Sequence, residues 1–319
     1  MTDLDNHFLG RDASERARRF DLEHARKLRA LAYRMLGSRA EAEDIVQEAW
    51  LRWAEVDSRT VLNEGAYLSR VVTNLCLDRL RSAAAQRASY VGVWLPDPLL
   101  DDAAIADDAP GPERQMEFAQ DVSVAFLLAL ERLSPLERAA FLLHDVFDLG
   151  YDEIARHLDR SEAACRQLIS RARKRVKADY ARREVAEEER QRLFHAFADA
   201  VRSRDVSSLA RVLAQDAVLL ADGGGKVTAV PRPLHGRAQV ALAFIGFARL
   251  PTSSGWRLEP ARVNGFPGCL LFDDLDGGRL VQTIALAPSA TQPGHIGAIY
   301  VQRNPDKLGH VTAVYGGPS

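Results

Sequence analysis

The chain has 319 residues but few cysteines, and it lacks any long hydrophobic run. Cys76, Cys165 and Cys269 stand far apart, without the close spacing of a metal or redox motif, so we expect free thiols in a reducing compartment. The longest predominantly apolar run, residues 122–130, falls far short of the roughly 20 residues that span a bilayer. The polar N-terminus lacks a signal-peptide core. We therefore expect a cytoplasmic protein without a membrane partner.

The chain also lacks a strong overall charge, with a formal net charge of −2, yet one stretch is markedly basic. Residues 160–177 contain seven Lys or Arg residues and a single acid, Glu162, which gives this stretch a local charge of +6. Such an excess predicts a polyanionic partner, most simply nucleic acid. The alternative is a solvated basic face with no partner, which is common on amphipathic helices.

The pattern around this stretch predicts a helix-turn-helix within residues 134–177. Ser134 and Glu137 have the spacing of a capping box, which predicts that a helix begins there. Gly150 is expected to adopt the left-handed conformation that ends this helix. The apolar positions of Tyr151–Leu158 predict a second, short helix, which a tight turn would connect to the third.

The third helix is predicted to begin at Ser161 and to be amphipathic. An apolar stripe would pack on the two preceding helices; it comprises Ala164, Cys165, Leu168, Ile169, Ala172 and Val176. The N-terminal part of a recognition helix enters the major groove, so the expected base-reading residues are Arg166, Gln167, Ser170 and Arg171. The residues expected to contact phosphate are Arg173, Lys174, Arg175 and Lys177.

Changes of composition divide the chain into an N-terminal segment and four further blocks. The predicted blocks are 1–19, a helical domain at 20–90, a linker at 91–112, a helical domain with the helix-turn-helix at 113–183, and a last domain at 184–319. The linker contains four prolines and five aspartates but no basic residue, which predicts an extended segment. Its apolar residues Trp94, Leu95 and Leu99 predict that part of it docks on another surface.

The last block changes from helical to strand-forming patterns along its length. Helices are predicted at about 187–204, 207–213 and 237–248, and β-segments at 256–264, 269–272, 280–286 and 296–303. Helices followed by a run of strands predict an α+β domain with a curved antiparallel sheet. The predicted fold class is therefore multidomain, with two all-α domains followed by this α+β domain.

A second motif lies in the first helical block. Leu28–Glu55 contains Ala32, Arg34, Leu36, Gly37, Ala42, Glu43, Asp44, Val46, Gln47, Glu48 and Trp50. This motif resembles conserved region 2 of bacterial extracytoplasmic-function (ECF) sigma factors, and residues 67–81 look like the rest of that region. The helix-turn-helix block, which opens with residues 133–138 and includes Ser170–Arg173, resembles region 4 of the same family. The two motifs stand in the family's order and cover about residues 20–183.

The resemblance implies roles for both helical domains. It implies that Asp44, Gln47 and Glu48 bind core RNA polymerase through its catalytic subunits. Recognition and melting of the −10 element of promoter DNA would fall to Asn74, Asp78, Arg79 and Arg81. Region 4 would read the −35 element, and the acidic linker would lie in a basic polymerase channel.

Three further segments resemble signatures of the subgroup that carries a fused SnoaL-like domain, which includes the SigJ-type factors. They are Trp94-Leu95-Pro96-Asp97-Pro98, Asp222-Gly223-Gly224-Gly225-Lys226 and Asn304-Pro305-Asp306-Lys307-Leu308. Asp97 stands where the usual signature has Glu. The resemblance implies an NTF2-like cone that regulates in cis, so that no separate anti-sigma factor is required. It also allows a small ligand in the cone and implies no cofactor.

The residues themselves predict how these three segments act together. Three consecutive glycines favour a close approach of backbone to another surface, and Val227 after Lys226 excludes a phosphate-binding P-loop. We expect the glycine loop and the 304–308 segment to contact the linker, with Trp94 as the anchor. This contact would set the spacing of the two DNA-binding blocks.

Two other functions remain open from the residues alone. One is a helix-turn-helix regulator with a ligand-sensing domain, which leaves the motif at 28–55 without a role. The other is a SnoaL-class enzyme with a DNA-binding appendage. An enzyme needs a defined polar constellation in the cone, and the loose candidates are Asp216, Asp222, His235 and Tyr300. Their spacing singles out none of them, so we predict no catalysis and no metal site.

Overall fold

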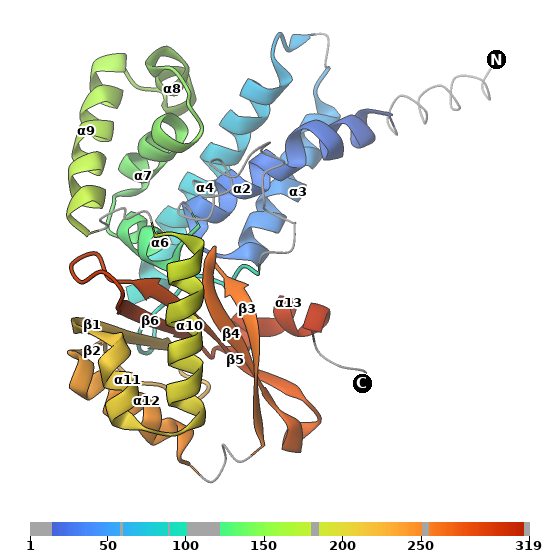
Figure 1. Ribbon diagram of the computed structural model, residues 1–319. Coiled ribbons are helices and arrows are strands. Elements are labelled where there is room, and N and C mark those ends of the chain that lie inside the picture. The colour runs from blue at the N-terminus through green and yellow to red at the C-terminus, as the bar shows by residue number, and fades with distance from the viewer. Residues whose placement is uncertain are drawn as a thin grey trace. The chain divides into compact units, whose positions relative to one another are not determined.

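A computed structural model describes residues 15–57, 60–88, 90–100, 122–179, 185–250 and 255–315 (Figure 1). The chain separates into two compact units. The described part of the first unit lies within residues 15–85 and 130–177. That of the second unit lies within residues 86–100, 122–129 and 178–315.

The first unit begins with helices around a large apolar core. Its elements are the π-helical turn η1 (Asp21–Ala25) and helices α2 (Arg26–Leu36), α3 (Arg39–Glu55) and α4 (Glu64–Ala88). Gly37 ends α2 in the left-handed conformation, with φ 70°, and Ser38 caps α3 by accepting a hydrogen bond from the Glu41 amide. Trp53 is almost fully buried, so the aromatic stripe of α3 faces the core.

The helix-turn-helix completes this unit. It comprises α7 (Pro135–Phe141), the π-helical turn η3 (Leu142–Val146), α8 (Tyr151–Leu158) and α9 (Glu162–Asp179). The predicted capping box is confirmed, because Ser134 Oγ accepts from the Glu137 amide at 3.3 Å and the Glu137 carboxylate accepts from the Ser134 amide at 3.1 Å. Ser161 Oγ accepts from the Ala164 amide at 3.2 Å, as expected of an N-cap.

One backbone prediction in this motif is wrong. Gly150 has a φ of −68° and is the N-cap of α8, whereas Asp148, with φ 56°, adopts the left-handed conformation after η3. Aspartate tolerates this conformation better than most residues with a side chain. The glycine is therefore placed at the start of the next helix rather than at the end of the previous one.

A buried arginine ties the helix-turn-helix to α2 within the first unit. Arg138 is 3% exposed, and its Nη1 atom donates to the Met35 carbonyl at 2.6 Å and pairs with Glu131 at 2.7 Å. Burial lowers the pKa of Arg138 to about 10. The guanidinium therefore remains charged at neutral pH, and it binds the Met35 carbonyl and the Glu131 carboxylate as a cation.

The second unit is built on a six-stranded sheet in the order β2-β1-β6-β5-β4-β3 (Figure 1). The strands are β1 (Leu213–Asp222), β2 (Leu234–His235), β3 (Trp256–Val263), β4 (Phe266–Asp273), β5 (Arg279–Pro288) and β6 (Ile296–Gln302). Neighbouring strands are antiparallel, except that β1 and β6 run parallel. The sheet is thus mixed and open, not wholly antiparallel as expected.

Different segments cover the two faces of this sheet. Helices α10 (Glu187–Arg202), α11 (Val206–Val212) and α12 (Arg237–Ala248) pack on one face, where Ile284 and Val301 contribute to the core. The neighbouring residues Ala285 and Tyr300 face the other side and pack with Leu95 and with the beginning of α6 (Val124–Glu131). Helix α13 (Pro305–Tyr315) covers a further cluster on that side, and η5 (Asp274–Asp276) links β4 to β5.

Strands β1 and β2 were not predicted from the sequence. Leu213–Asp222 reads LAQDAVLLAD, and its alanines and leucines favour a helix by intrinsic propensity. In the structure the segment pairs with β6 and β2, and its side chains are largely buried, so tertiary context decides its conformation. His235 lies in β2, directly before Gly236, the N-cap of α12.

The three cysteines are buried and unbridged. Burial raises the pKa of Cys269 to about 12 and also raises the pKa of Cys76 and Cys165. Among the described residues, no helix is long and apolar enough to cross a membrane, and no group of His, Cys, Asp and Glu side chains has the arrangement of a metal site.

Two glycines of the second unit offer a matched test of the packing. A Cβ at Gly268 in β4 would overlap the Ile284 carbonyl, whereas a Cβ at Gly246 in α12 would meet no atom within 4 Å. Gly268→Ala should lower the free energy of unfolding by about 1–3 kcal/mol through overpacking. Gly246→Ala should raise it by roughly 0.5–1 kcal/mol through helix propensity. Urea denaturation of both variants measures the difference, and equal midpoints would contradict the tight β4–β5 packing.

Candidate functional site

Helix α9 presents the predicted DNA-reading side chains on its solvent face. All of them are exposed, namely Arg166, Gln167, Ser170, Arg171, Arg173, Lys174, Arg175 and Lys177. Of the predicted apolar stripe, Ala164 is half-buried and the other five residues are buried. The helix therefore has the amphipathic form that a recognition helix requires.

Two of these cations are held by one buried carboxylate. Arg171 Nε donates to Glu137 at 3.0 Å and Arg175 Nη1 donates to it at 2.8 Å, while the Glu137 side chain is only 5% exposed. Burial raises the pKa of Glu137, but hydrogen bonds from Ser134 and Arg171 and the charge of Arg175 outweigh it and lower the pKa overall. The ion pairs hold α9 against the N-terminus of α7.

Two further arginines of α9 have partners within the same domain. Arg173 makes two hydrogen bonds to the Asp145 carboxylate, at 2.6 and 2.8 Å, and these bonds raise its pKa. Arg166 pairs with Glu162 at 3.0 Å and lies over the Tyr151 ring at 4.2 Å. The side chains that make no hydrogen bond or ion pair with another described residue are Gln167, Ser170, Lys174 and Lys177.

The acidic edge predicted on α3 is open to solvent. Asp44 and Gln47 are exposed, and neither makes a side-chain hydrogen bond with another described residue. Glu48 is half-buried and pairs with Arg52 at 2.7 Å. All three lie on one edge of the helix, above the buried aromatic stripe.

On α4 the four predicted DNA-contacting residues are within reach of solvent. Asn74, Asp78 and Arg81 are exposed, and Arg79 is half-buried. Arg81 pairs with Asp78 at 2.9 Å, and Arg79 lies 3.6 Å from Glu41 on α3. Asn74 makes no side-chain hydrogen bond with another described residue and so has a free amide to offer a ligand.

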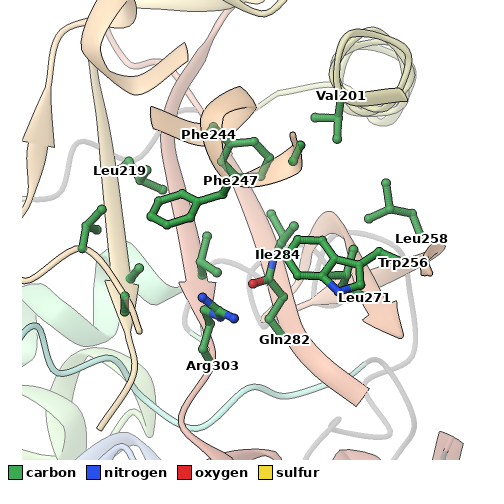
Figure 2. A pocket seen from close by; sticks show the side chains of 15 residues that line it. Val201, Leu219, Phe244, Phe247, Trp256, Leu258, Leu271, Gln282, Ile284 and Arg303 are labelled. Carbon is green, nitrogen blue, oxygen red and sulfur yellow. The ribbon is translucent and has the colours of Figure 1, made fainter. Parts of the chain in front are cut away.

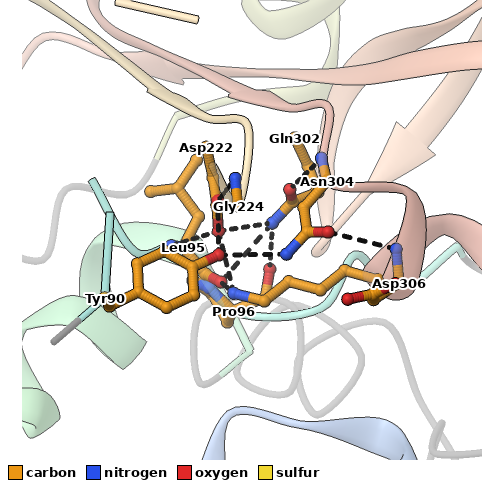
Figure 3. Close-up of polar contacts among 9 residues, drawn as sticks. Tyr90, Leu95, Pro96, Asp222, Gly224, Gln302, Asn304 and Asp306 are labelled. Atoms are coloured by element: carbon orange, nitrogen blue, oxygen red, sulfur yellow. Dashed lines mark hydrogen bonds and ion pairs between the residues drawn. The ribbon is translucent and has the colours of Figure 1, made fainter. Parts of the chain in front are cut away.

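The second unit holds the first part of the linker in a polar cluster that we call the linker clasp (Figure 3). Its residues come from three places in the sequence: Tyr90, directly before the linker, and Leu95 within it; Asp222 from the end of β1; and Gln302, Asn304 and Lys307 from the end of β6 and the start of α13.

Asp222 is the centre of the clasp and is fully buried. Its carboxylate accepts hydrogen bonds from the Leu95 amide at 2.9 Å, the Tyr90 hydroxyl at 2.6 Å, Gln302 Nε2 at 3.2 Å, the Gly224 amide at 2.9 Å and Lys307 Nζ at 2.8 Å. A buried carboxylate is stable only when it is paired and hydrogen-bonded, and these five donors meet that need.

Lys307 joins the carboxylate to the linker. Besides pairing with Asp222, its Nζ atom donates to the Leu95 carbonyl at 2.5 Å. It also lies over the rings of Trp94 and Tyr90, at 4.5 and 5.1 Å from their centroids. One cation therefore binds a carboxylate, a backbone carbonyl and two aromatic rings, and three of these groups belong to residues 90–95.

Two amide side chains complete the hydrogen bonding. Gln302 Nε2 lies 3.4 Å from the Leu95 carbonyl and 3.3 Å from the Pro96 carbonyl. Asn304 Nδ2 donates to the Tyr90 hydroxyl at 3.0 Å, while its Oδ1 accepts from the Asp306 amide in the first turn of α13. Burial and the hydrogen bond to Asp222 raise the pKa of Tyr90, so this hydroxyl remains a donor.

The glycine loop fits closely against the same cluster. Gly224 and Gly225 have φ values of 61° and 71°, and a Cβ on Gly224 would overlap the Asn304 amide. A Cβ on Gly223 would overlap the Val227 carbonyl. Lys226 pairs with Asp306 at 2.6 Å, in the turn of α13 that begins at Pro305, and so closes the loop over the helix.

Comparison with known proteins identifies the family. The family described as "Sigma-70 region 2" matches residues 22–86, and "Sigma-70, region 4" matches residues 123–176. The ECF RNA polymerase sigma factor SigJ of Mycobacterium tuberculosis is 37% identical over 298 residues, which cover 88% of this chain and 89% of SigJ. This chain belongs to the ECF RNA polymerase sigma factors.

Other relatives agree with this assignment. The probable ECF RNA polymerase sigma factor SigI of M. tuberculosis is 32% identical to this sigma factor over 192 residues, which cover 60% of this chain and 64% of SigI. The crystal structure of M. tuberculosis SigJ aligns with a TM-score of 0.68 and 33% identity, over 89% of this chain and 95% of that one. Because this alignment covers 89% of the chain, it extends into the C-terminal α+β domain.

Family membership settles the choice between the functions considered above. A sigma factor directs promoter-specific initiation of transcription and is not an enzyme. The four loose catalytic candidates also lie in four different environments, so the structure does not bring them together in one site. Asp222 lies in the clasp, His235 is exposed on β2, Asp216 is exposed near Thr291, and Tyr300 packs on the linker side of the sheet.

The clasp differs from the sequence-based expectation in its anchor. Leu95 is 2% exposed and packs with Ala285 and Tyr300, whereas Trp94 is half-buried beneath the Lys307 ammonium. Tyr90 and Gln302 also belong to the clasp and were not predicted from the sequence. The signal for Gln302 was its position two residues before Asn304 at the end of a strand, where alternate side chains share a face. For Tyr90, which lies more than 130 residues from Asp222, the local pattern held no signal.

A substitution at the centre of the clasp tests its hold on the linker. Asp222→Asn removes the negative charge that pairs with Lys307 and accepts from the Leu95 amide. This change should destabilise the docked linker by about 1–3 kcal/mol. We expect amide hydrogen exchange at Leu95 to become roughly tenfold faster or more, because exchange follows the free energy of local opening. Asp216→Asn is the matched control, since that carboxylate is exposed on the same strand. Unchanged protection of Leu95 in Asp222→Asn would contradict the role of this carboxylate.

Proposed function

We propose that this sigma factor reads promoter DNA with both of its helical domains, region 2 and region 4. In this proposal its NTF2-like domain regulates in cis, by binding the linker that joins the two helical domains in the sequence. The observation that carries the proposal is the linker clasp, in which Asp222 and Lys307 bind the backbone of Leu95. A tether that is bound along its first part has fewer conformations than a free one. The clasp thereby determines how readily both readers engage DNA together.

The surface that binds core RNA polymerase is, in this proposal, the edge of α3 formed by Asp44, Gln47 and Glu48. Asp44 and Gln47 are exposed and have no side-chain partner among the described residues, which supports this role, because a docking surface must be available to its partner. Negative charge also favours attachment to a basic surface. Since polymerase acts in the cytoplasm, we place the chain there.

Recognition and melting of the −10 element belong, in this proposal, to the exposed face of α4. The Asn74 amide, which makes no hydrogen bond with another described residue, can hydrogen-bond an extruded base. Arg79 and Arg81 supply positive charge for the single strand, and Asp78 orients Arg81 through the 2.9 Å ion pair.

The −35 element is read, in this proposal, by the exposed face of α9. The ion pairs of the arginines refine the expected division of roles. Arg171 and Arg173 each use guanidinium donors on Glu137 and Asp145, so their substitution would also loosen the packing of the domain. Gln167 and Ser170 are therefore better base-reading candidates than Arg171, and Lys174 and Lys177 are the phosphate-contacting ones.

Cis-regulation also determines which protein partners are needed. A fused domain that controls the linker can replace the regulation that a separate anti-sigma factor provides. We therefore propose that none is required. The NTF2-like cone leaves room for a small ligand, which would provide the signal that a separate regulator otherwise receives.

The division of roles on α9 can be tested with two variants in the reconstituted polymerase complex. Gln167→Ala should reduce discrimination at one −35 position by about 1–3 kcal/mol. Lys174→Ala should weaken binding to every promoter alike and reduce the slope of log affinity against log salt by about one. Fluorescence anisotropy over a salt series with single-base promoter variants measures both effects. The same uniform loss in both variants would contradict the assignment.

A second test addresses the clasp itself. Leu95→Asp places a charge in an apolar site, and Gly224→Val adds a side chain where the Asn304 amide lies. Both changes should free the linker and lower promoter-specific initiation by reconstituted polymerase about fivefold or more, the range of a coupling of 1–3 kcal/mol. Arg232→Gln, at an exposed arginine of the same domain, is the control. Wild-type initiation by both clasp variants, with the linker shown to be free, would disprove cis-regulation through the clasp.

A further inference from the structure

A cavity lies between the sheet of the second unit and its covering helices (Figure 2). Its walls are mainly apolar and include Val201 of α10, Phe244 and Phe247 of α12, and Trp256 and Leu258 of β3. Its volume is about 60 Å³. On the scale on which one buried water takes about 10–15 Å³, this cavity holds roughly four to six waters or a small organic molecule.

Two polar side chains enter this apolar space from one side. Thr283 of β5 pairs with Gln302 of β6, so Gln282 and Arg303 follow as neighbours on the opposite face of the sheet. Figure 2 shows the Gln282 amide and the Arg303 guanidinium directed into the same space. The two groups are thus placed to hold one ligand together.

Neither group is fully satisfied by the protein. The side chain of Gln282 belongs to a residue that is only 8% exposed, and it makes no hydrogen bond with another described residue. Arg303 Nη1 donates to the Thr228 carbonyl at 2.5 Å, but its Nε is buried without a partner, and no described carboxylate pairs with it. The Nε atom of Arg303 is thus a buried donor without an acceptor, which is costly unless water or a bound group satisfies it.

The chemistry of the two side chains defines the ligand they fit. Arginine matches a carboxylate in shape and charge, and the Gln282 amide adds a donor for a second oxygen. Burial lowers the pKa of Arg303, but an arginine guanidinium remains cationic at neutral pH. The phenylalanine, tryptophan and aliphatic side chains opposite require an apolar body.

We propose that this cavity binds a small monocarboxylate with an apolar tail, whose carboxylate is held by Arg303 and Gln282.

Binding there has a direct route to the linker clasp. Along residues 302–304 the side chains alternate: Gln302 and Asn304 belong to the clasp, and Arg303 between them lines the cavity. The Arg303 amide donates to the Asp222 carbonyl at 2.8 Å, and its guanidinium holds Thr228, just beyond the glycine loop. A carboxylate on Arg303 competes with Thr228 and so alters the support of the clasp. This regulatory part rests on the proposed cis-regulation, whereas the binding part does not.

The binding part is tested on the full-length chain without polymerase. Isothermal titration with benzoate and pentanoate is compared with titration of the isosteric amides benzamide and pentanamide. We expect the acids to bind and the amides to bind about tenfold more weakly or not at all, since a charge-assisted hydrogen bond is lost. This comparison needs no variant and so does not depend on the folding of one. Equal binding of acid and amide, or no binding of either acid at millimolar concentration, would overturn the proposal.

Three variants then assign the residues. Arg303→Gln should weaken benzoate binding about tenfold and abolish the preference for acid over amide, whereas Arg303→Lys should keep part of that preference. Gln282→Leu should weaken binding less, and Arg232→Gln, at an exposed arginine outside the cavity, should bind as the wild type does. Undiminished acid preference in Arg303→Gln would show that the carboxylate binds elsewhere and would refute the assignment.

The link to the clasp has its own readout. Saturating benzoate should change amide exchange at Leu95 at least threefold in the wild type and leave it unchanged in Arg303→Gln. If benzoate binds with the expected preference but leaves Leu95 unaffected, the link fails while the ligand site stands. The transcription assay on Leu95→Asp and Gly224→Val addresses cis-regulation separately, so the two failures are distinguishable.

Discussion

Asp222 carries a negative charge in a position with no access to solvent, and the surrounding structure is arranged to keep that charge stable. Lys307 supplies the compensating charge, and the remaining hydrogen bonds come from Tyr90, Gln302 and backbone amides. Two of the five donors to the Asp222 carboxylate belong to Tyr90 and Leu95, so the carboxylate is fully hydrogen-bonded only when this segment is docked. Losing these contacts would remove two of the five donors to this carboxylate, so the docked linker contributes to the stability of the buried charge. The free energy of linker docking and the stability of the domain are thus coupled through Asp222.

The first unit uses the same device on a smaller scale. Glu137 is a buried carboxylate that caps α7 through Ser134 and at the same time receives Arg171 and Arg175 from the recognition helix. The charge that would contact DNA is therefore partly used to hold the helix in place. Of the predicted DNA-reading side chains of α9, those without a hydrogen bond or ion pair to another described residue are therefore Gln167, Ser170, Lys174 and Lys177. Packing and the proposed reading of DNA thus fall to different residues of one helix.

Local patterns predicted the elements that depend on local chemistry. The capping box at Ser134, the N-cap at Ser161 and the buried stripe of α9 follow from short-range rules, and the structure agrees with them. Strand β1 could not be predicted in this way, because its Ala- and Leu-rich sequence becomes a strand only through pairing with β6. The clasp was partly predictable: the glycine loop and Asn304 carry a recognisable pattern, and strand alternation before Asn304 indicates Gln302, whereas Tyr90 joins them through a contact across 132 residues. Sequence separation of this size leaves no periodic trace.

The burial of the three cysteines has a practical consequence for this chain. A thiol reacts with electrophiles as the thiolate, and burial keeps Cys76, Cys165 and Cys269 both protonated and out of reach. Maleimide reagents therefore find no native target on the folded surface. A single cysteine introduced on the linker or on α9 can carry a dye or spin label without first removing the native ones, and labelling of the native thiols in turn reports the fraction of unfolded chain.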